Sequence, residues 1–292
     1  MKASAFAYAR ATSVGNALEL LAAHGDKAKV LSGGQSLLPA MNLRLISPEF
    51  IVDISELDEL RGIAVRDNAL TIGALTRHVD LLRSPEIAAH ARLLAEAVAH
   101  VAHPAIRNRG TLGGSLAHAD PASELPACML ALDATMIVRS ESGERRVPAV
   151  EFFRGIYETA LSANELLVAV ELPVAQINSV HFFHEFARRH GDYAIAGLAS
   201  LAIVEGRLFK DLRLAFFAVA DRPVLARAAN RLINVDVTPA LMSGALVALG
   251  EELSPQEDQQ ASPAMRGQLA KVLLRRCVSA LLGRPELEAA AS

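Results

Sequence analysis

The glycines of this chain gather in three short segments, and the first two segments have the same make-up. The first glycine loop is Ser32-Gly33-Gly34-Gln35-Ser36, and the second glycine loop is Gly110-Thr111-Leu112-Gly113-Gly114-Ser115. Because glycine has no side chain, such loops let the backbone approach a ligand closely and turn successive N–H groups towards a phosphate. The two loops predict one long ligand held at two points, and a dinucleotide with a pyrophosphate bridge meets that requirement.

A single glycine pair is more often an ordinary turn than a cofactor site, so the neighbouring elements matter. The first glycine loop follows a strand expected at 29–31 and precedes a helix expected at 37–45, whose start favours an anion. The sequence lacks the three spaced glycines of the Rossmann fingerprint, and no Gly-Lys-Ser/Thr follows as in a P-loop. We therefore expect neither of these nucleotide-binding folds.

Composition places the chain among globular proteins with a large core, since 52% of its 292 residues are hydrophobic. The net charge of −3, with no basic stripe, argues against nucleic acid. Charged residues or histidines interrupt every apolar run before the ~20 residues of a membrane span, and no signal-type segment opens the chain. Only Cys128 and Cys277 are present, which predicts buried free thiols and a cytoplasmic location and leaves no thiolate set for an iron–sulfur cluster.

The periodicity of apolar residues predicts an α+β protein whose pattern changes near residue 175. Before that point we expect a helix at 13–24, a strand at 51–54, a hairpin at 63–72, a helix at 85–99, an irregular stretch at 101–121, a helix at 122–132 and strands at 135–139, 145–147 and 166–172. After it we expect antiparallel strands at 180–187, 193–204 and 207–220, then helices at 223–232, 239–249 and 264–282. A strand meander followed by helices indicates a separate α+β unit.

Two carboxylates follow the second glycine loop. Asp120 and Glu124 stand where a side chain could accept hydrogen bonds from ribose or ribityl hydroxyls, or could cap the helix that starts near residue 122. The two roles are equally supported for Asp120, whereas we favour the ligand role for Glu124. A zinc site built from His100, His103 and His118 is disfavoured because no further ligand has the right spacing.

Tyr193 lies in the third segment, Arg188 to Ala194, where a charged stretch passes into an apolar strand. A tyrosine at such a boundary either packs in the core or stacks on a flat ring while its hydroxyl stays solvated. Both alternatives remain open from the residues alone.

These motifs resemble the medium, FAD-binding subunit of molybdenum hydroxylases of the xanthine dehydrogenase family, a group that includes carbon monoxide, quinoline and nicotine dehydrogenases. The resemblance rests on the runs from Ser32 to Pro39 and from Ile106 to Ser115, with support from the start of the chain (Phe6, Tyr8, Arg10) and from Gly191-Asp192-Tyr193-Ala194. It implies a vanillyl-alcohol-oxidase-type (PCMH-like) FAD-binding domain of two subdomains, at 1–55 and 56–174. A C-terminal α+β domain at 175–285, with a three-stranded antiparallel sheet and a helix bundle, would follow.

The resemblance also implies the site residues. Residues 31–38 and 110–115 would cradle the diphosphate and ribityl chain, Leu167 would lie against the flavin, and Tyr193 would border its ring as the catalytic residue. His184 stands where xanthine-oxidising relatives carry lysine, and Glu124 where many relatives carry aspartate. The full set of expected cofactor-binding residues is Leu31, Ser32, Gly33, Gly34, Gln35, Ser36, Leu37, Leu38, Val101, Gly110, Thr111, Gly113, Gly114, Ser115, Asp120, Glu124, Leu167, His184, Asp192 and Tyr193.

The resemblance implies that the chain is the electron-transfer subunit from which electrons leave the complex. FAD, held non-covalently, would take electrons from a [2Fe-2S] small subunit fed by a molybdenum large subunit and pass them to an external acceptor. The complex, expected as a dimer of heterotrimers, would hold two [2Fe-2S] clusters and a molybdopterin cofactor on the partner subunits. Two alternatives remain: a self-contained FAD-dependent reductase of the same flavin fold, for which we find no proton donor, and a cofactor-less binding module, against which the intact glycine pairs argue.

Overall fold

The N-terminal part of the protein is a small parallel sheet. In the computed structural model, which describes residues 2–176 and 178–289, the strand order is β1-β3-β2. Its elements are β1 (Ala7–Arg10), α1 (Val14–His24), η1 (Gly25–Lys27), β2 (Ala28–Leu31), α2 (Leu37–Asn42), β3 (Phe50–Asp53) and η2 (Asp58–Leu60). Ser13 caps α1, and the buried side of that helix packs on the sheet. The first glycine loop directly follows β2.

The middle part is an antiparallel sheet of order β4-β5-β10-β6-β7 with helices against it. The strands are β4 (Ile63–Arg66), β5 (Ala69–Gly73), β6 (Thr135–Ser140), β7 (Gly143–Pro148) and β10 (Leu166–Pro173). The helices are α3 (His78–Arg83), α4 (Pro85–His90), α5 (Arg92–His100), α6 (Pro104–Arg107), α7 (Leu112–His118), α8 (Glu124–Ala131) and α9 (Ala149–Phe152). A short hairpin of β8 (Phe153–Gly155) and β9 (Glu158–Thr159) follows α9.

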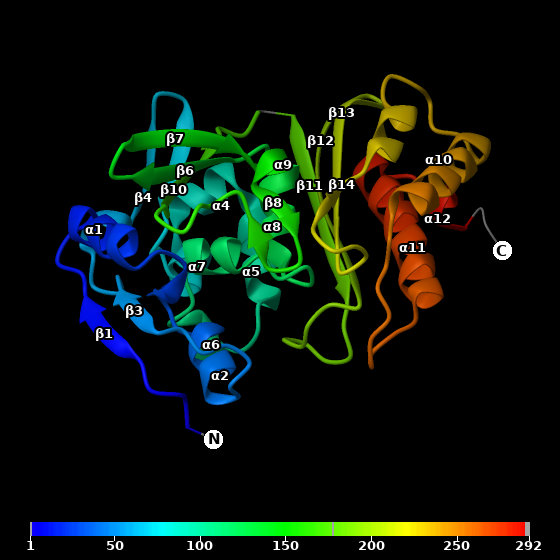
Figure 1. The fold of residues 1–292 in the computed structure, drawn as a ribbon. Coiled ribbons are helices and arrows are strands. Elements are labelled where there is room, and N and C mark those ends of the chain that lie inside the picture. Colours follow the sequence, from blue (N-terminus) through cyan, green and yellow to red (C-terminus); the bar gives the residue numbers. More distant parts are fainter. Residues whose placement is uncertain (1, 177, 290–292) are drawn as a thin grey trace.

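The C-terminal part is an antiparallel sheet of order β11-β12-β13-β14 covered by helices. It consists of β11 (Ser179–Phe186), β12 (Ala196–Glu205), β13 (Leu208–Phe217), β14 (Val224–Leu225), η3 (Arg227–Leu232), α10 (Pro239–Glu252), α11 (Pro263–Leu282) and α12 (Glu286–Ala289). In Figure 1 this sheet stands between the helices of the middle part on one side and α10 and α11 on the other. Its two faces therefore belong to two different cores.

Three clusters of buried side chains hold these layers together. One lies between α1 and the parallel sheet, and one lies under α10 and α11. The third fills the middle part and continues into the C-terminal sheet, because Phe183 of β11 and Phe217 of β13 belong to it. Every residue of α8 is buried in this layer. The chain division at 55 and 174 remains a prediction, and the middle and C-terminal parts share one continuous core.

The mixed α+β architecture agrees with the sequence pattern, but several elements differ from expectation. The helix expected at 85–99 breaks at Ala91, whose backbone is non-helical, into α4 and α5. The stretch 101–121, expected to be irregular, contains α6 and α7. The helix expected at 223–232 is instead β14 and the 3₁₀ helix η3, so a fourth, two-residue strand joins the three long ones.

Candidate functional site

The two glycine loops touch each other. A Cβ atom on Gly33 would lie 2.3 Å from the carbonyl oxygen of Arg109 and 2.9 Å from Cα of Gly110. The hydroxyl oxygens of Ser32 and Thr111 are 3.2 Å apart, within hydrogen-bond distance. The loops therefore form one backbone cradle, and only glycine at position 33 permits this approach.

The first glycine loop leaves β2 at Leu31 and turns through Gly34, whose φ of +72° favours glycine. The side-chain amide of Gln35 donates to the carbonyl oxygen of Gly33 at 2.8 Å, which fixes the turn. Side chains of Leu31 and Leu38 pack close to Gly34 on one side. The remaining expected residues of this segment lead into α2, with Ser36 preceding the helix and Leu37 beginning it.

The second glycine loop opens helix α7. Thr111 is the N-cap, since its hydroxyl accepts from the N–H of Gly114 at 3.1 Å. Gly113 lies against the backbone of Ala74, where a Cβ would come within 2.6 Å of the alanine methyl group. A Cβ on Gly114 would meet the hydroxyls of both Ser32 and Thr111 at 2.8 Å. The glycine pair thus allows close packing within a helix, and neither Gly113 nor Gly114 has a positive φ.

His78, which sequence reasoning missed, contacts two residues of the second glycine loop, Thr111 and Ser115. It is 3% exposed, and its Nε2 lies 3.1 Å from the carbonyl oxygen of Thr111 and 3.2 Å from the hydroxyl of Ser115. Because a carbonyl only accepts, Nε2 carries the proton. Burial lowers the pKa of His78 to about 4, so the ring is neutral near pH 7. A histidine at the start of an amphipathic helix gave no sequence signal for this role.

Asp120 takes part in a local turn and in a contact with an aromatic side chain. Its Oδ1 accepts from the N–H of Ala122 at 2.9 Å, a local turn that leads towards α8. Its Oδ2 lies 3.5 Å from the hydroxyl of Tyr157, whose ring stacks on His118 with ring centres 4.8 Å apart. Tyr157, at the turn between β8 and β9, was not expected at this site. Its φ of +56° is uncommon for a residue with a side chain.

Glu124 and Tyr193 lie near Asp120. Glu124 begins α8 and is 7% exposed, and burial together with the charge of Glu185 raises its pKa to about 8. Tyr193 is 57% exposed, and partial desolvation together with the charge of Asp120 raises the pKa of its phenol to about 12. A side chain so exposed is not part of the core, which disfavours the packing role for Tyr193.

Val101, Leu167 and Asp192, which were also expected to bind the cofactor, lie in other elements. Val101 follows α5, where the guanidinium of Arg107 donates to its carbonyl oxygen at 2.9 Å. Leu167 is buried in β10, a strand that contacts α7. Asp192 is exposed beside Tyr193.

His184 is separated from the other expected residues. Side chains alternate along β11, and His184 lies with Phe182 and Phe186 on the face that packs towards α11, where its Nε2 is 3.4 Å from a guanidinium nitrogen of Arg276. Its neighbour Glu185 points to the opposite face, towards α5. The two neighbours differ because a strand presents successive residues to opposite sides, and the cofactor role expected for His184 remains a prediction.

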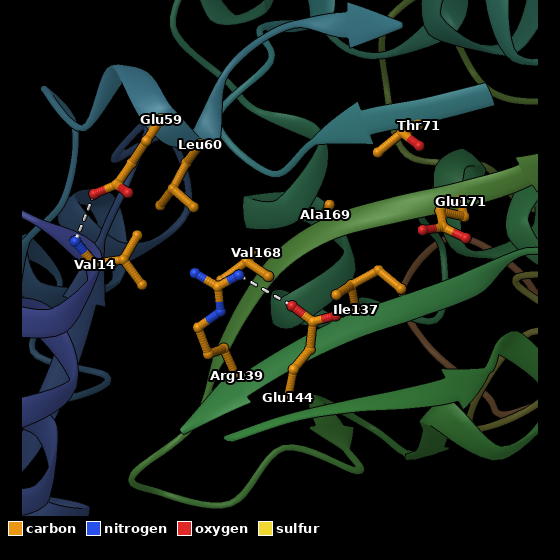
Figure 2. A pocket seen from close by; sticks show the side chains of 10 residues that line it. All are labelled: Val14, Glu59, Leu60, Thr71, Ile137, Arg139, Glu144, Val168, Ala169 and Glu171. Carbon is orange, nitrogen blue, oxygen red and sulfur yellow. Dashed lines mark hydrogen bonds and ion pairs between the residues drawn. The ribbon is translucent and has the colours of Figure 1, made fainter. Parts of the chain in front are cut away.

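The surface of the described residues has hollows, two of which we compare with the expected site. One has a volume of about 240 Å³. It lies between the start of α1 and the strands β5, β6, β7 and β10, and Val14, Glu59 and Arg139 are among its lining residues (Figure 2). None of the expected cofactor residues lines it. The second, of about 480 Å³, includes Asp192 and Tyr193, and its other lining residues are Arg188, Gly191, Gln259 and Gln260.

A buried cation holds the strand that follows Tyr193. Arg266 of α11 is 5% exposed and donates to the carbonyl oxygens of Ile195 and Ala218 at 2.6 and 2.9 Å. It also pairs with Asp258 at 2.6 Å, in the segment that lines the second hollow. Arg266 of α11 therefore joins the backbone two residues after Tyr193 to Asp258, which directly precedes the lining residues Gln259 and Gln260.

Metal clusters and membrane spans are both missing from residues 2–176 and 178–289. Within these ranges no three His, Cys, Asp or Glu side chains are grouped as metal ligands. No helix in the same ranges has the length and apolar content that crossing a membrane requires.

Two known protein families match most of the chain. The family described as "FAD binding domain in molybdopterin dehydrogenase" matches residues 4–175, which include both glycine loops. The chain belongs to this family. The family described as "CO dehydrogenase flavoprotein C-terminal domain" matches residues 181–281. The expected family, FAD-binding function and fold are thereby confirmed.

Individual relatives cover nearly the full length. The 6-hydroxypseudooxynicotine dehydrogenase complex subunit alpha of Paenarthrobacter nicotinovorans is 39% identical over 97% of both chains. A chain of the carbon monoxide dehydrogenase of Hydrogenophaga pseudoflava superposes with a TM-score of 0.94 at 36% identity, over 97% of this chain and 99% of that one. A chain of quinoline 2-oxidoreductase of Pseudomonas putida 86 gives 0.89 and 38% over the same shares.

The residues present fit the diphosphate part of an FAD. The cradle between Gly33 and Gly110 has no room for a Cβ atom, and Gly34 holds the turn that a side chain would strain. The hydroxyls of Ser32 and Thr111 face each other at its centre, where phosphate or ribityl oxygens would be partners. Family membership and local geometry therefore agree.

Proposed function

We propose that this chain is the FAD-carrying electron-transfer subunit of a molybdenum-containing hydroxylase complex. The contact between Gly33 and Gly110 carries the proposal, because it joins the two family motifs into one cradle for an extended ligand. FAD supplies the redox chemistry there, accepting electrons and releasing them to an external acceptor. The chain is an oxidoreductase subunit and would not hydroxylate a substrate alone.

The residues of this chain bind and orient the cofactor. In the proposed site Ser32, Thr111 and the N–H groups of both glycine loops bind the diphosphate. The helices that follow the loops have only six and seven residues, so the binding relies on the loops rather than on long helix dipoles. Asp120 and Glu124 would face the ribityl chain or the ring, and Leu167 would pack beside them.

Tyr193 is the residue that we assign to the ring and to the approach of the acceptor. Its side chain is more than half exposed and borders the 480 Å³ hollow. A phenol with a pKa of about 12 stays protonated at neutral pH, so it can donate a hydrogen bond while its ring shields the cofactor. We infer that the acceptor enters through this hollow and that movement of Tyr193 alters its access.

The electrons must come from other subunits. The sequence holds only Cys128 and Cys277, and both are buried, so the chain offers no thiolate set for an iron–sulfur cluster. Relatives are subunits of larger complexes, such as the complex subunit alpha from Paenarthrobacter. We propose a [2Fe-2S] small subunit and a molybdenum large subunit as partners, in a dimer of heterotrimers. The two free thiols favour the cytoplasm.

The test is the spectrum and composition of the complex purified from cells that express all its genes. We expect flavin absorbance at about one FAD per chain, release of all the flavin into the supernatant on acid precipitation, and co-purification with two further chains. Protein without flavin would refute the proposal in favour of a binding module. A flavin-loaded chain that purifies alone and turns over a substrate would favour the self-contained reductase.

A further inference from the structure

Two buried carboxylates, Glu124 and Glu185, and the partly exposed His100 form a group that we call the buried acid cluster. Glu124 begins α8, Glu185 lies on β11 and His100 ends α5, and α5 packs against both α8 and β11. Glu124 is 7% exposed, and the side chain of Glu185 is 4% exposed. Charged groups are rarely buried to this extent without a purpose or a partner.

The contacts of the buried acid cluster run from the site to the surface. His100 Nδ1 lies 3.4 Å from Oε1 of Glu185, whereas Oε2 of Glu185 is buried and has no hydrogen-bond partner among the described residues. The His100 ring is 5.4 Å from the ring of His190, which is exposed in the segment before Tyr193. Glu124, at the inner end, lies near Asp120.

Burial, with charge repulsion as a second cause, favours the protonated form of Glu124 in the buried acid cluster. Two carboxylates buried near each other do not both ionise, so one of them keeps a proton. Burial and the negative charge of Glu185 raise the pKa of Glu124 to about 8, whereas the hydrogen bond with Glu185 raises the pKa of His100. At neutral pH Glu124 therefore keeps its proton, and Glu185 lies beside His100.

Other titratable or charged groups lie around the cluster, some of them on the far face of β11. Glu96 lies on α5, Asp120 before α8 and Cys128 within α8. His181 and His184 lie on the two faces of β11, and His190 and Tyr193 lie in the loop after it. Arg276 lies on α11. Glu96 is already paired with His181 at 3.2 Å, and this second pair of α5 and β11 is more exposed. It offers a matched control.

We propose that Glu124 is a proton-holding group of the cofactor site, and that Glu185 and His100 carry protons between it and solvent at His190. The inference rests on the proposed function, because an electron pair arriving on a flavin must be matched by proton uptake. The pair comes from the iron–sulfur partner. The O–H bond of Glu124 breaks as its proton moves to a flavin nitrogen, and the carboxylate that remains regains a proton through Glu185 from the imidazolium of His100. His100 is then reprotonated from solvent, so the cluster returns to its starting charge, and the flavin, with two electrons and one proton gained, carries one added negative charge.

The first test is infrared titration of the carboxylic C=O band between pH 5 and 10, on the chain with FAD and after its removal. We expect a buried carboxylic band that Glu124→Gln abolishes. Glu185→Gln should lower the midpoint of its titration by at least one pH unit, a tenfold change in proton affinity, because the neighbouring charge is gone. Glu96→Gln should leave the midpoint unchanged. A band absent at pH 6, or one that Glu185→Gln does not move, would overturn the proposal.

The second test follows proton uptake itself, with a pH-indicator dye, after photoreduction of the FAD-loaded chain. We expect His100→Gln to slow proton uptake at least tenfold, with Glu96→Gln at the wild-type rate and melting temperatures confirming that both variants fold. Wild-type uptake in His100→Gln would refute the path. The two proposals fail differently: a wild-type complex without flavin contradicts the proposed function, whereas a flavin-loaded chain without the carboxylic band contradicts only the proton site.

Discussion

Gly33→Ala is the most direct test of the contact between the two glycine loops. The new Cβ would lie 2.3 Å from the Arg109 carbonyl oxygen and 2.9 Å from Gly110 Cα, both backbone atoms. Ordinary contacts need ~3.5 Å, so the loops must separate by about 1 Å. That movement would break the 3.2 Å contact of the Ser32 and Thr111 hydroxyls. Gly33 has no positive φ, so the effect of the substitution is steric alone.

The expected size of the effect follows from the cost of overpacking. Such insertions destabilise by ~1–3 kcal/mol. At about 2–4 °C per kcal/mol for a domain of this size, the melting temperature should fall by roughly 2–12 °C. FAD affinity should fall at least tenfold, since both halves of the cradle move. Thermal melting and equilibrium dialysis of FAD on the same preparation measure both effects.

The matched control is Gly267→Ala in α11, where no atom lies within 4 Å of the new Cβ. It should keep wild-type flavin content and gain ~0.5–1 kcal/mol, because alanine loses less backbone freedom in a helix. If Gly33→Ala binds FAD and melts like the wild type, the two loops do not form one cradle, and the reasoning is refuted.

The other predictions concern the same site. Gly114→Val, whose Cβ would meet two hydroxyls at 2.8 Å, should fold but lose most of its FAD; full flavin stoichiometry would contradict this. Tyr193→Ala should retain FAD and melt within ~2 °C of the wild type, because an exposed side chain contributes little stability, while flavin reoxidation by the acceptor changes several-fold. A lowered melting point with unchanged reoxidation would assign Tyr193 to the core. The pKa of His78 is lowered from 6.5 to about 4, so its stabilising contribution is complete above pH 6.5 and is lost as the pH falls towards 4. His78→Asn should remove up to about 3 kcal/mol of that acid sensitivity, seen as a flatter plot of unfolding free energy against pH, and an unchanged slope would exclude His78 as its source.

The glycine motifs identified the two loops that the structure brings together, because close backbone packing requires glycine. Ser32 and Thr111 meet as two loops around one ligand require. The helix α7 could not be predicted from the sequence, because each of its two glycines costs about 1 kcal/mol of helix propensity. Burial of Leu112 and Leu116 and the cap from Thr111 outweigh that cost.

The supporting side chains could not be predicted because their role depends on three-dimensional neighbours. Glu185 and His184 are adjacent in sequence, yet they face different cores, and periodicity alone does not say which face of β11 meets the site. His78 acts through carbonyl and hydroxyl partners more than thirty residues away. No fixed spacing along a sequence marks such contacts, because they depend on how distant elements pack.

Arg266 has a consequence for how sequence variants of this subunit are interpreted. Its guanidinium lies in α11, more than 70 residues beyond Tyr193, and outside every glycine motif. A missense change there would be judged harmless by motif matching, yet it would release the backbone at Ile195 and Ala218 together with Asp258. From the role proposed for Tyr193, we expect such a change to alter flavin reoxidation by the acceptor while the cofactor motifs stay intact. Distance along the gene is therefore a poor guide to which substitutions impair this electron-transfer subunit.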